Sequence, residues 1–239
     1  MSKILDLTDN LLQRRRNYEF INDMDDVTSG GRYTTLVAAG ASIVTSNTPG
    51  AAATLATGAT INTPALVALT NLPFLMTKDL PAFFEARLKY TEAATNKADL
   101  FVGFSSLFPA DTLSTQGLGP NSSFSGAGFY KLDGQLNWGV MVSNAGVQTL
   151  VPLTSLVAIN KLAAATGVGA YQVLKIEITN VTATAADVLF YIDTVLVYAI
   201  KGWTWTGSVA MSAGVEIKDG SAVSESCVLD YFVGAMARF

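Results

Sequence analysis

The chain of 239 residues contains no histidine and a single cysteine, Cys227. Histidine is the side chain that most often acts as a general base or a metal ligand, so its absence argues against the commonest hydrolytic and metal-dependent mechanisms. One cysteine cannot form an intrachain disulfide, which excludes a small extracellular scaffold built on disulfides. Because Cys227 precedes Val228 and Leu229, we expect it to be a buried apolar side chain rather than a reactive thiol.

Charged residues are also scarce. They make up 14% of the sequence, against about 25% in typical globular domains, while hydrophobic residues make up 50%. A folded chain with so little charge has a surface suited to burial against other subunits, so we expect a homo-oligomer. The net charge of −4 argues against a nucleic acid partner, because proteins that bind nucleic acids present a basic face.

No segment predicts membrane insertion or secretion. The most apolar stretch, 188–200, is interrupted by Asp193 and Thr194 and falls short of the roughly 18 apolar residues that a spanning helix needs. Residues 1–6 contain neither an apolar core nor a small-residue cleavage site, so no signal peptide is expected. The prediction is therefore a chain without a membrane partner.

Residues 1–32 differ from the rest and are interpreted as an extended, partly helical arm in front of a domain spanning 33–239. Leucine and isoleucine recur at helical spacing near the start, and Ser29–Gly31 is typical of a hinge. Apolar side chains of this arm are expected to anchor it on a neighbouring subunit, and three adjacent arginines to pair with carboxylates there. The predicted contact residues are Leu5, Leu11, Leu12, Arg14, Arg15, Arg16, Tyr18 and Phe20.

From Tyr33 onward, short runs rich in Val, Ile, Thr, Phe and Tyr alternate with turn residues, a pattern typical of an all-β sandwich. Alternation is clearest in 174–178, where Leu174, Ile176 and Ile178 are expected to face the core. The predicted strands are Tyr33–Ala38, Ala65–Leu69, Ala82–Tyr90, Leu100–Ser105, Ala127–Leu132, Leu136–Ser143, Tyr171–Thr179, Asp187–Ile192, Val195–Ile200, Val209–Ile217 and Cys227–Arg238.

Two segments need separate treatment. The Ala-, Gly- and Thr-rich stretch 38–63 predicts two strands of small residues with their loops. Residues 155–165 predict a short helix, with Ser155 as its N-cap and Gly167 as its terminator.

Four motifs, in this order, are similar to those of concanavalin/laminin-G-like jelly rolls, and in particular to head-decoration (cement) proteins of tailed bacteriophages. They are Phe83–Lys89, Asp99–Ser105, Leu174–Ile178 followed by Val188–Asp193, and Val228–Arg238. Thr194 stands where the family has glycine after Asp193. Since threonine tolerates positive φ poorly, a turn wider than two residues is expected there.

The resemblance implies a structural virion protein without cofactors that stabilises a capsid by bridging capsomers on its outer surface. It is expected to be made in the host cytoplasm, to bind the major capsid protein, and to form trimers, because decoration proteins of this type often sit at three-fold positions. The alternative is a lectin-like receptor-binding or fibre-associated module of the same virion that binds glycans.

Neither catalysis nor metal binding is predicted from the sequence. Glu85, Glu177 and Glu216 each stand alone in their strands, although a pair assembled from distant segments remains open. The acidic run 22–26 lacks regular calcium-loop spacing, and a solvated or arginine-paired turn is favoured there. Trp203 and Trp205 lie on one face of an extended segment, and packing or an interface is favoured over sugar binding.

Overall fold

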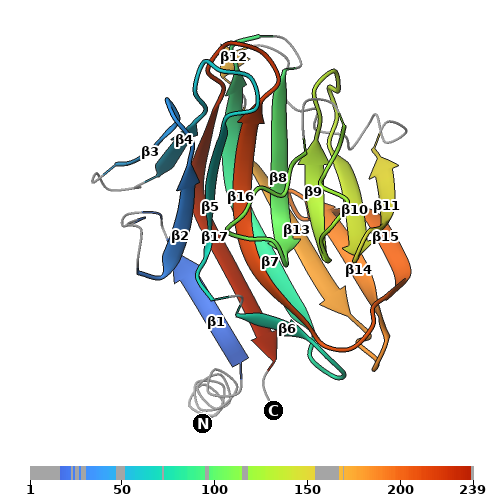
Figure 1. The fold of residues 1–239 in the computed structure, drawn as a ribbon. Helices are drawn as coiled ribbons and strands as arrows, with labels where there is room; N and C mark the ends of the chain where they lie inside the picture. The colour runs from blue at the N-terminus through green and yellow to red at the C-terminus, as the bar shows by residue number, and fades with distance from the viewer. Residues whose placement is uncertain are drawn as a thin grey trace.

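The computed structural model describes residues 17–22, 24, 27, 31–46, 52–71, 73–94, 97–114, 118–153, 167–168 and 170–237. These residues form two antiparallel sheets packed face to face (Figure 1). The described part of the chain contains no helix capable of spanning a membrane. The helix predicted at 155–165 lies outside the described residues.

Sheet A has nine described strands, and its centre is occupied by the last strand of the chain. In order across the sheet they are β15 (Val195–Thr204), β14 (Ala185–Ile192), β13 (Gln172–Thr179), β7 (Ala82–Glu92), β17 (Ser226–Ala237), β4 (Ala53–Ala56) and β3 (Ser42–Thr45). Strand β12 (Gly167–Val168) also pairs with β7. Strand β1 (Asn17–Asn22) pairs with residues 232–237 of β17, next to β4, which pairs with 226–229.

Sheet B has eight described strands. They are β11 (Val147–Pro152), β10 (Gly139–Asn144), β9 (Gly126–Lys131), β8 (Ala98–Ser105), β16 (Val209–Asp219), β5 (Pro64–Leu69) and β2 (Tyr33–Val37), with β6 (Phe74–Met76) beside β16. The two strands predicted within 38–63 are confirmed as β3 and β4. Strand β1 adds 17–22 to the sandwich, so part of the segment interpreted as an arm pairs with its own domain.

The main core lies between the sheets and follows the alternation of the strands. Residues Leu174, Ile176 and Ile178 of β13 are fully buried, as the sequence pattern predicts. Cys227 is also buried, and burial raises the pKa of its thiol to about 12, which confirms its assignment as an apolar core side chain. In β7 the residues at 82, 84, 86, 88, 90 and 92 face inward in the same way.

A second, smaller core covers the outer face of sheet B. There Phe108, Leu113 and Phe124 of the segment 106–125 pack against Phe101 and Tyr130 of the sheet. Two glycines make room for these rings. A Cβ on Gly128 would lie 2.5 Å from the Phe101 ring, and one on Gly139 would lie 2.3 Å from the Tyr130 ring. The absence of a side chain at these two glycines lets the Phe101 and Tyr130 rings lie directly against the backbone of the neighbouring strand. Phe108, Leu113 and Phe124 then pack over this part of the face.

The β14–β15 hairpin turns in two residues, Asp193 and Thr194, with φ values of 46° and 72°. The expectation of a wider turn is wrong. The side chain of Asp193 accepts a hydrogen bond from the Val173 amide at 2.8 Å, and its own amide donates to the Val173 carbonyl at 2.8 Å. These two bonds hold the tight turn against β13 and offset the cost of left-handed backbone at a threonine.

Replacing Thr194 with glycine should therefore stabilise the fold. Glycine adopts positive φ without steric cost, and we expect a gain of roughly 0.5–1 kcal/mol in the free energy of unfolding. The matched control is Thr54→Gly in the interior strand β4, which should lower stability. Urea denaturation of both variants measures the difference, and equal destabilisation by the two would contradict the role assigned to the turn.

Candidate functional site

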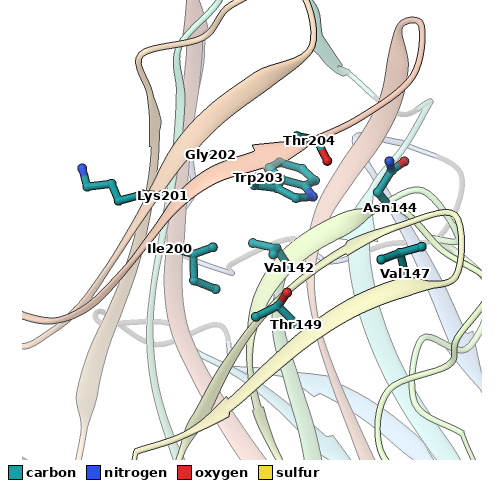
Figure 2. A pocket seen from close by; sticks show the side chains of 9 residues that line it. All are labelled: Val142, Asn144, Val147, Thr149, Ile200, Lys201, Gly202, Trp203 and Thr204. Carbon is teal, nitrogen blue, oxygen red and sulfur yellow. The ribbon is translucent and has the colours of Figure 1, made fainter.

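A cleft of about 210 Å³ opens where an edge of each sheet meets the other. One wall is the β10–β11 hairpin at the edge of sheet B, and the other is the C-terminal half of β15 at the edge of sheet A (Figure 2). The lining residues are Val142, Asn144, Val147, Thr149, Ile200, Lys201, Gly202, Trp203 and Thr204. None of the segments is a long loop, so the cleft is built on paired strands.

The floor of the cleft is apolar. Val142 and Trp203 are 3% and 5% exposed, and both belong to the core between the sheets. The Trp203 ring packs against that of Trp205, with 5.5 Å between centroids, so the two indoles predicted to share a face do lie together in the core. Within the described residues, the Nε1–H of Trp203 has no hydrogen-bond acceptor. Such a buried donor normally has a partner, from the protein, water or a ligand.

The rim is polar and uncharged on the side of Asn144. Asn144 lies at the end of β10, Thr149 projects from β11, and Thr204 ends β15. Their side chains make no hydrogen bonds with other described residues. Figure 2 shows the Trp203 indole above Val142 and beside Asn144, with Thr149 and Val147 beyond these two residues. The cleft thus combines an aromatic, apolar floor with uncommitted hydroxyl and amide groups, as small-molecule sites commonly do.

The one charged lining residue is already paired. Nζ of Lys201 lies 3.0 Å from Oδ2 of Asp187, in the neighbouring strand β14. Asp187 stands at an irregularity in the β14–β15 register and also accepts hydrogen bonds from the Asn180 side chain and the Gly202 amide. Hydrogen bonds from Asn180, Lys201 and Gly202 lower the pKa of Asp187, so the carboxylate stays ionised beside the lysine.

Two neighbouring carboxyl groups lie elsewhere, where the loop after β8 meets sheet B: Glu216 of β16 and Asp111, whose side chain is 35% exposed. Glu216 of β16 is fully buried and accepts the amides of Thr112 and Leu113 at 2.9 and 3.4 Å. Burial raises the pKa of Glu216, and the adjacent Asp111 carboxyl raises it further. Lys218 donates to Asp111 and to the carbonyls of Leu113 and Ser114.

The sequence shows no second carboxylate beside Glu216 within its strand, because the neighbouring Asp111 lies 105 positions earlier in the chain. Both Glu216 oxygens already accept backbone amides, and the side chain has no exposed surface. Glu216 therefore anchors Thr112 and Leu113 on sheet B and is not accessible to a ligand. Among the described residues, no group of three Asp, Glu, Cys or His side chains is placed to hold a metal ion.

The predicted arm residues are only partly described. Leu5, Leu11, Leu12, Arg14, Arg15 and Arg16 lie outside the described residues, as does most of the acidic run 22–26. The backbone of Tyr18 and Phe20 pairs with Met236 and Gly234 of β17 in the same chain. Their proposed contact with a neighbouring subunit stays a prediction.

No protein-family model matches this chain, and no curated protein matches its sequence. Its fold is similar to that of an endo-β-1,4-glucuronan lyase from the fungus Trichoderma reesei, with a TM-score of 0.58 and 11% identity over 92% of this chain and 95% of that one. It is also similar to the Emp46p carbohydrate recognition domain, with a TM-score of 0.57 and 12% identity. That alignment covers 89% of this chain and 94% of the Emp46p domain. A third similar structure is a seed lectin of Lotus tetragonolobus, with a TM-score of 0.57 and 10% identity. That alignment covers 93% of this chain and 100% of the lectin.

The fold is a concanavalin-like jelly roll. This confirms the all-β sandwich predicted from the strand motifs, and the low identities limit the likeness to the fold. The prediction that the chain is not an enzyme is corrected by the first of these structures. That structure is a lyase, so this architecture is compatible with catalysis, and the lack of histidine and of paired carboxylates within a strand is not sufficient to exclude it.

One buried carboxyl group makes stability depend on pH. Burial raises the pKa of Asp99 to about 7, although it accepts the Asp133 amide and lies near Lys131. Below its usual pKa of 3.8 the group is protonated in both folded and unfolded chains. As the pH rises toward 7 the unfolded chain releases this proton more readily, so the contribution of Asp99 to stability is lost over that interval.

Asp99→Asn should remove this dependence, because an amide oxygen can still accept from Asp133 and does not titrate. Relative to wild type, the variant is expected to gain stability between pH 4 and pH 8. The upper limit of the gain is about 4 kcal/mol, at about 1.4 kcal/mol per pKa unit. Urea denaturation of both proteins across this range provides the measurement. A stability difference that does not change with pH would show that the carboxyl group is not responsible.

Proposed function

We propose that this protein binds carbohydrate, as a lectin does, in the cleft between β11 and β15. The observation that carries the proposal is the chemistry of that cleft. A buried tryptophan with an unpaired Nε1–H lies beside Asn144, Thr149 and Thr204, whose side chains are free to exchange hydrogen bonds. Sugars present apolar C–H surfaces together with hydroxyl groups, and this site offers a partner for each.

The size of the cleft supports one sugar ring. Its volume of about 210 Å³ is below the roughly 300 Å³ at which sites for drug-sized ligands begin. Val147 at the rim is 77% exposed and extends the apolar surface outward from the floor. A longer glycan would therefore place one ring in the cleft and continue over the exposed edge strands.

The likeness to two carbohydrate-binding proteins supports the proposal at the level of fold. An Emp46p domain described as a carbohydrate recognition domain and a seed lectin both have this architecture. For Trp203 and Trp205 the sequence favours packing or an interface over sugar binding. Trp205 is 3% exposed and does not line the cleft, whereas Trp203 both packs in the core and forms the cleft floor.

Binding to a glycan array, followed by titration calorimetry of the strongest hit, tests the proposal. Trp203→Phe removes the unpaired donor and part of the floor, and should weaken affinity about tenfold or more, which equals about 1.4 kcal/mol. Trp205→Phe removes an indole that is equally buried but outside the cleft, and should leave affinity within about twofold. Asn144→Ala, a change at the rim, should weaken binding without loss of thermal stability.

Thermal melting of each variant separates loss of the site from loss of the fold. An array without any hit would refute the proposal. So would a hit whose affinity falls equally in the Trp203 and Trp205 variants, because that result would trace the effect to the core and not to the cleft.

Capsid decoration stays a prediction from the sequence. So do its three parts: the major capsid protein as partner, a trimer as the oligomer, and the outer surface of the virion as the location. The exposed apolar side chains of three edge strands favour it, among them Val44, Leu150 and Leu196. If the prediction holds, deletion of residues 1–16, which leaves β1 in place, should keep the melting temperature within a few degrees and reduce occupancy on undecorated capsids. Sedimentation as a monomer at high concentration would count against it.

A further inference from the structure

We infer that the cleft selects an uncharged sugar ring and rejects uronic and other acidic sugars. This inference rests on the proposed function and specifies the class of ligand. It starts from four of the side chains that line the cleft: the indole of Trp203 in the floor, the amide of Asn144, and the hydroxyls of Thr149 and Thr204. Each polar group among them is neutral at all ordinary pH values.

The one cation among the residues that line the cleft already has a carboxylate partner. Lys201 is bonded to Asp187, and Asp187 is held in place by Asn180 and by the Gly202 amide. Figure 2 shows the Lys201 side chain extending away from the group formed by Val142, Asn144 and Thr149. A carboxylate lowered onto the floor would therefore lose water without gaining a positive partner, which is unfavourable.

The remaining groups match hydroxyls better than carboxylates. The Asn144 amide and the two threonine hydroxyls can each donate and accept, as adjacent sugar hydroxyls also do, whereas an ionised carboxylate only accepts. The Nε1–H of Trp203 is a further donor, but it is buried at the floor of the cleft. The protein as a whole carries a net charge of −4, which repels polyanionic glycans at long range.

The test uses the full chain and matched hexasaccharides of glucose, mannose, galactose and glucuronic acid, at 20 and 300 mM NaCl. We expect at least one neutral hexasaccharide to bind with an affinity that changes less than twofold between the two salt concentrations. The glucuronate hexasaccharide should bind at least tenfold more weakly. Asn144→Ala and Thr149→Val should each reduce neutral binding about fivefold or more.

The outcomes separate this inference from the proposed function. If the glucuronate hexasaccharide binds best, loses affinity in high salt, and is no longer bound by Lys201→Ala, the cleft is a glycan site but the inference is wrong. If the neutral ligand binds equally well in the Asn144 and Thr149 variants, the inference also fails, because the groups on which it depends are not used. If no hexasaccharide of either kind binds, the proposed function itself is refuted.

Discussion

A chain of aromatic contacts across the interior fixes the distance between the two sheets. It runs from Phe74 to Phe104 in sheet B, then to Phe84 and Phe232 in sheet A, and back to Tyr33 in sheet B. Ring centroids along it are 4.9–5.8 Å apart, and three of the four contacts are edge-on. Edge-on aromatic pairs are favoured by the ring quadrupole beyond the area they bury. The five rings come from five different strands of the two sheets. These contacts therefore hold the middle of one sheet against the middle of the other.

The cleft follows from what happens at the end of that interior. Among the described strands, β11 and β15 are the outermost of their sheets at this end, and the inward-facing Val142 and Trp203 near these edges line the cleft. On the outer face of sheet B the opposite occurs. There the segment 106–125 covers the sheet and is anchored through Glu216 and Lys218. In the described part of the chain, residues around Phe108, Leu113 and Phe124 therefore cover part of the outer face of sheet B, whereas the cleft lies at an edge of the sandwich.

Local patterns were enough to predict much of the sandwich, because alternation along a strand reports which face is buried. Residues 174–178 show this clearly, and β7 follows the same rule. Strand β11 was missed, since an exposed edge strand has no buried face to impose alternation. The turn at Thr194 was misjudged because its stability comes from Asp193 bonding to Val173, twenty positions away. The cleft was beyond sequence reasoning, as it joins 142–149 to 200–204 only through the packing of two sheets.

The central position of β17 has a consequence for synthesis on the ribosome. Strands β1, β4 and β7 are made before β17 and all pair with it, and without β17 sheet A would be divided into separate groups. Sheet B depends in the same way on β16, which joins β5 and β6 to β8. A nascent chain must therefore extend through β16 before sheet B can close and through β17 before sheet A can close. Until then the apolar faces of its strands are exposed and can bind chaperones or aggregate. This is typical of folds dominated by contacts between residues that are distant in sequence.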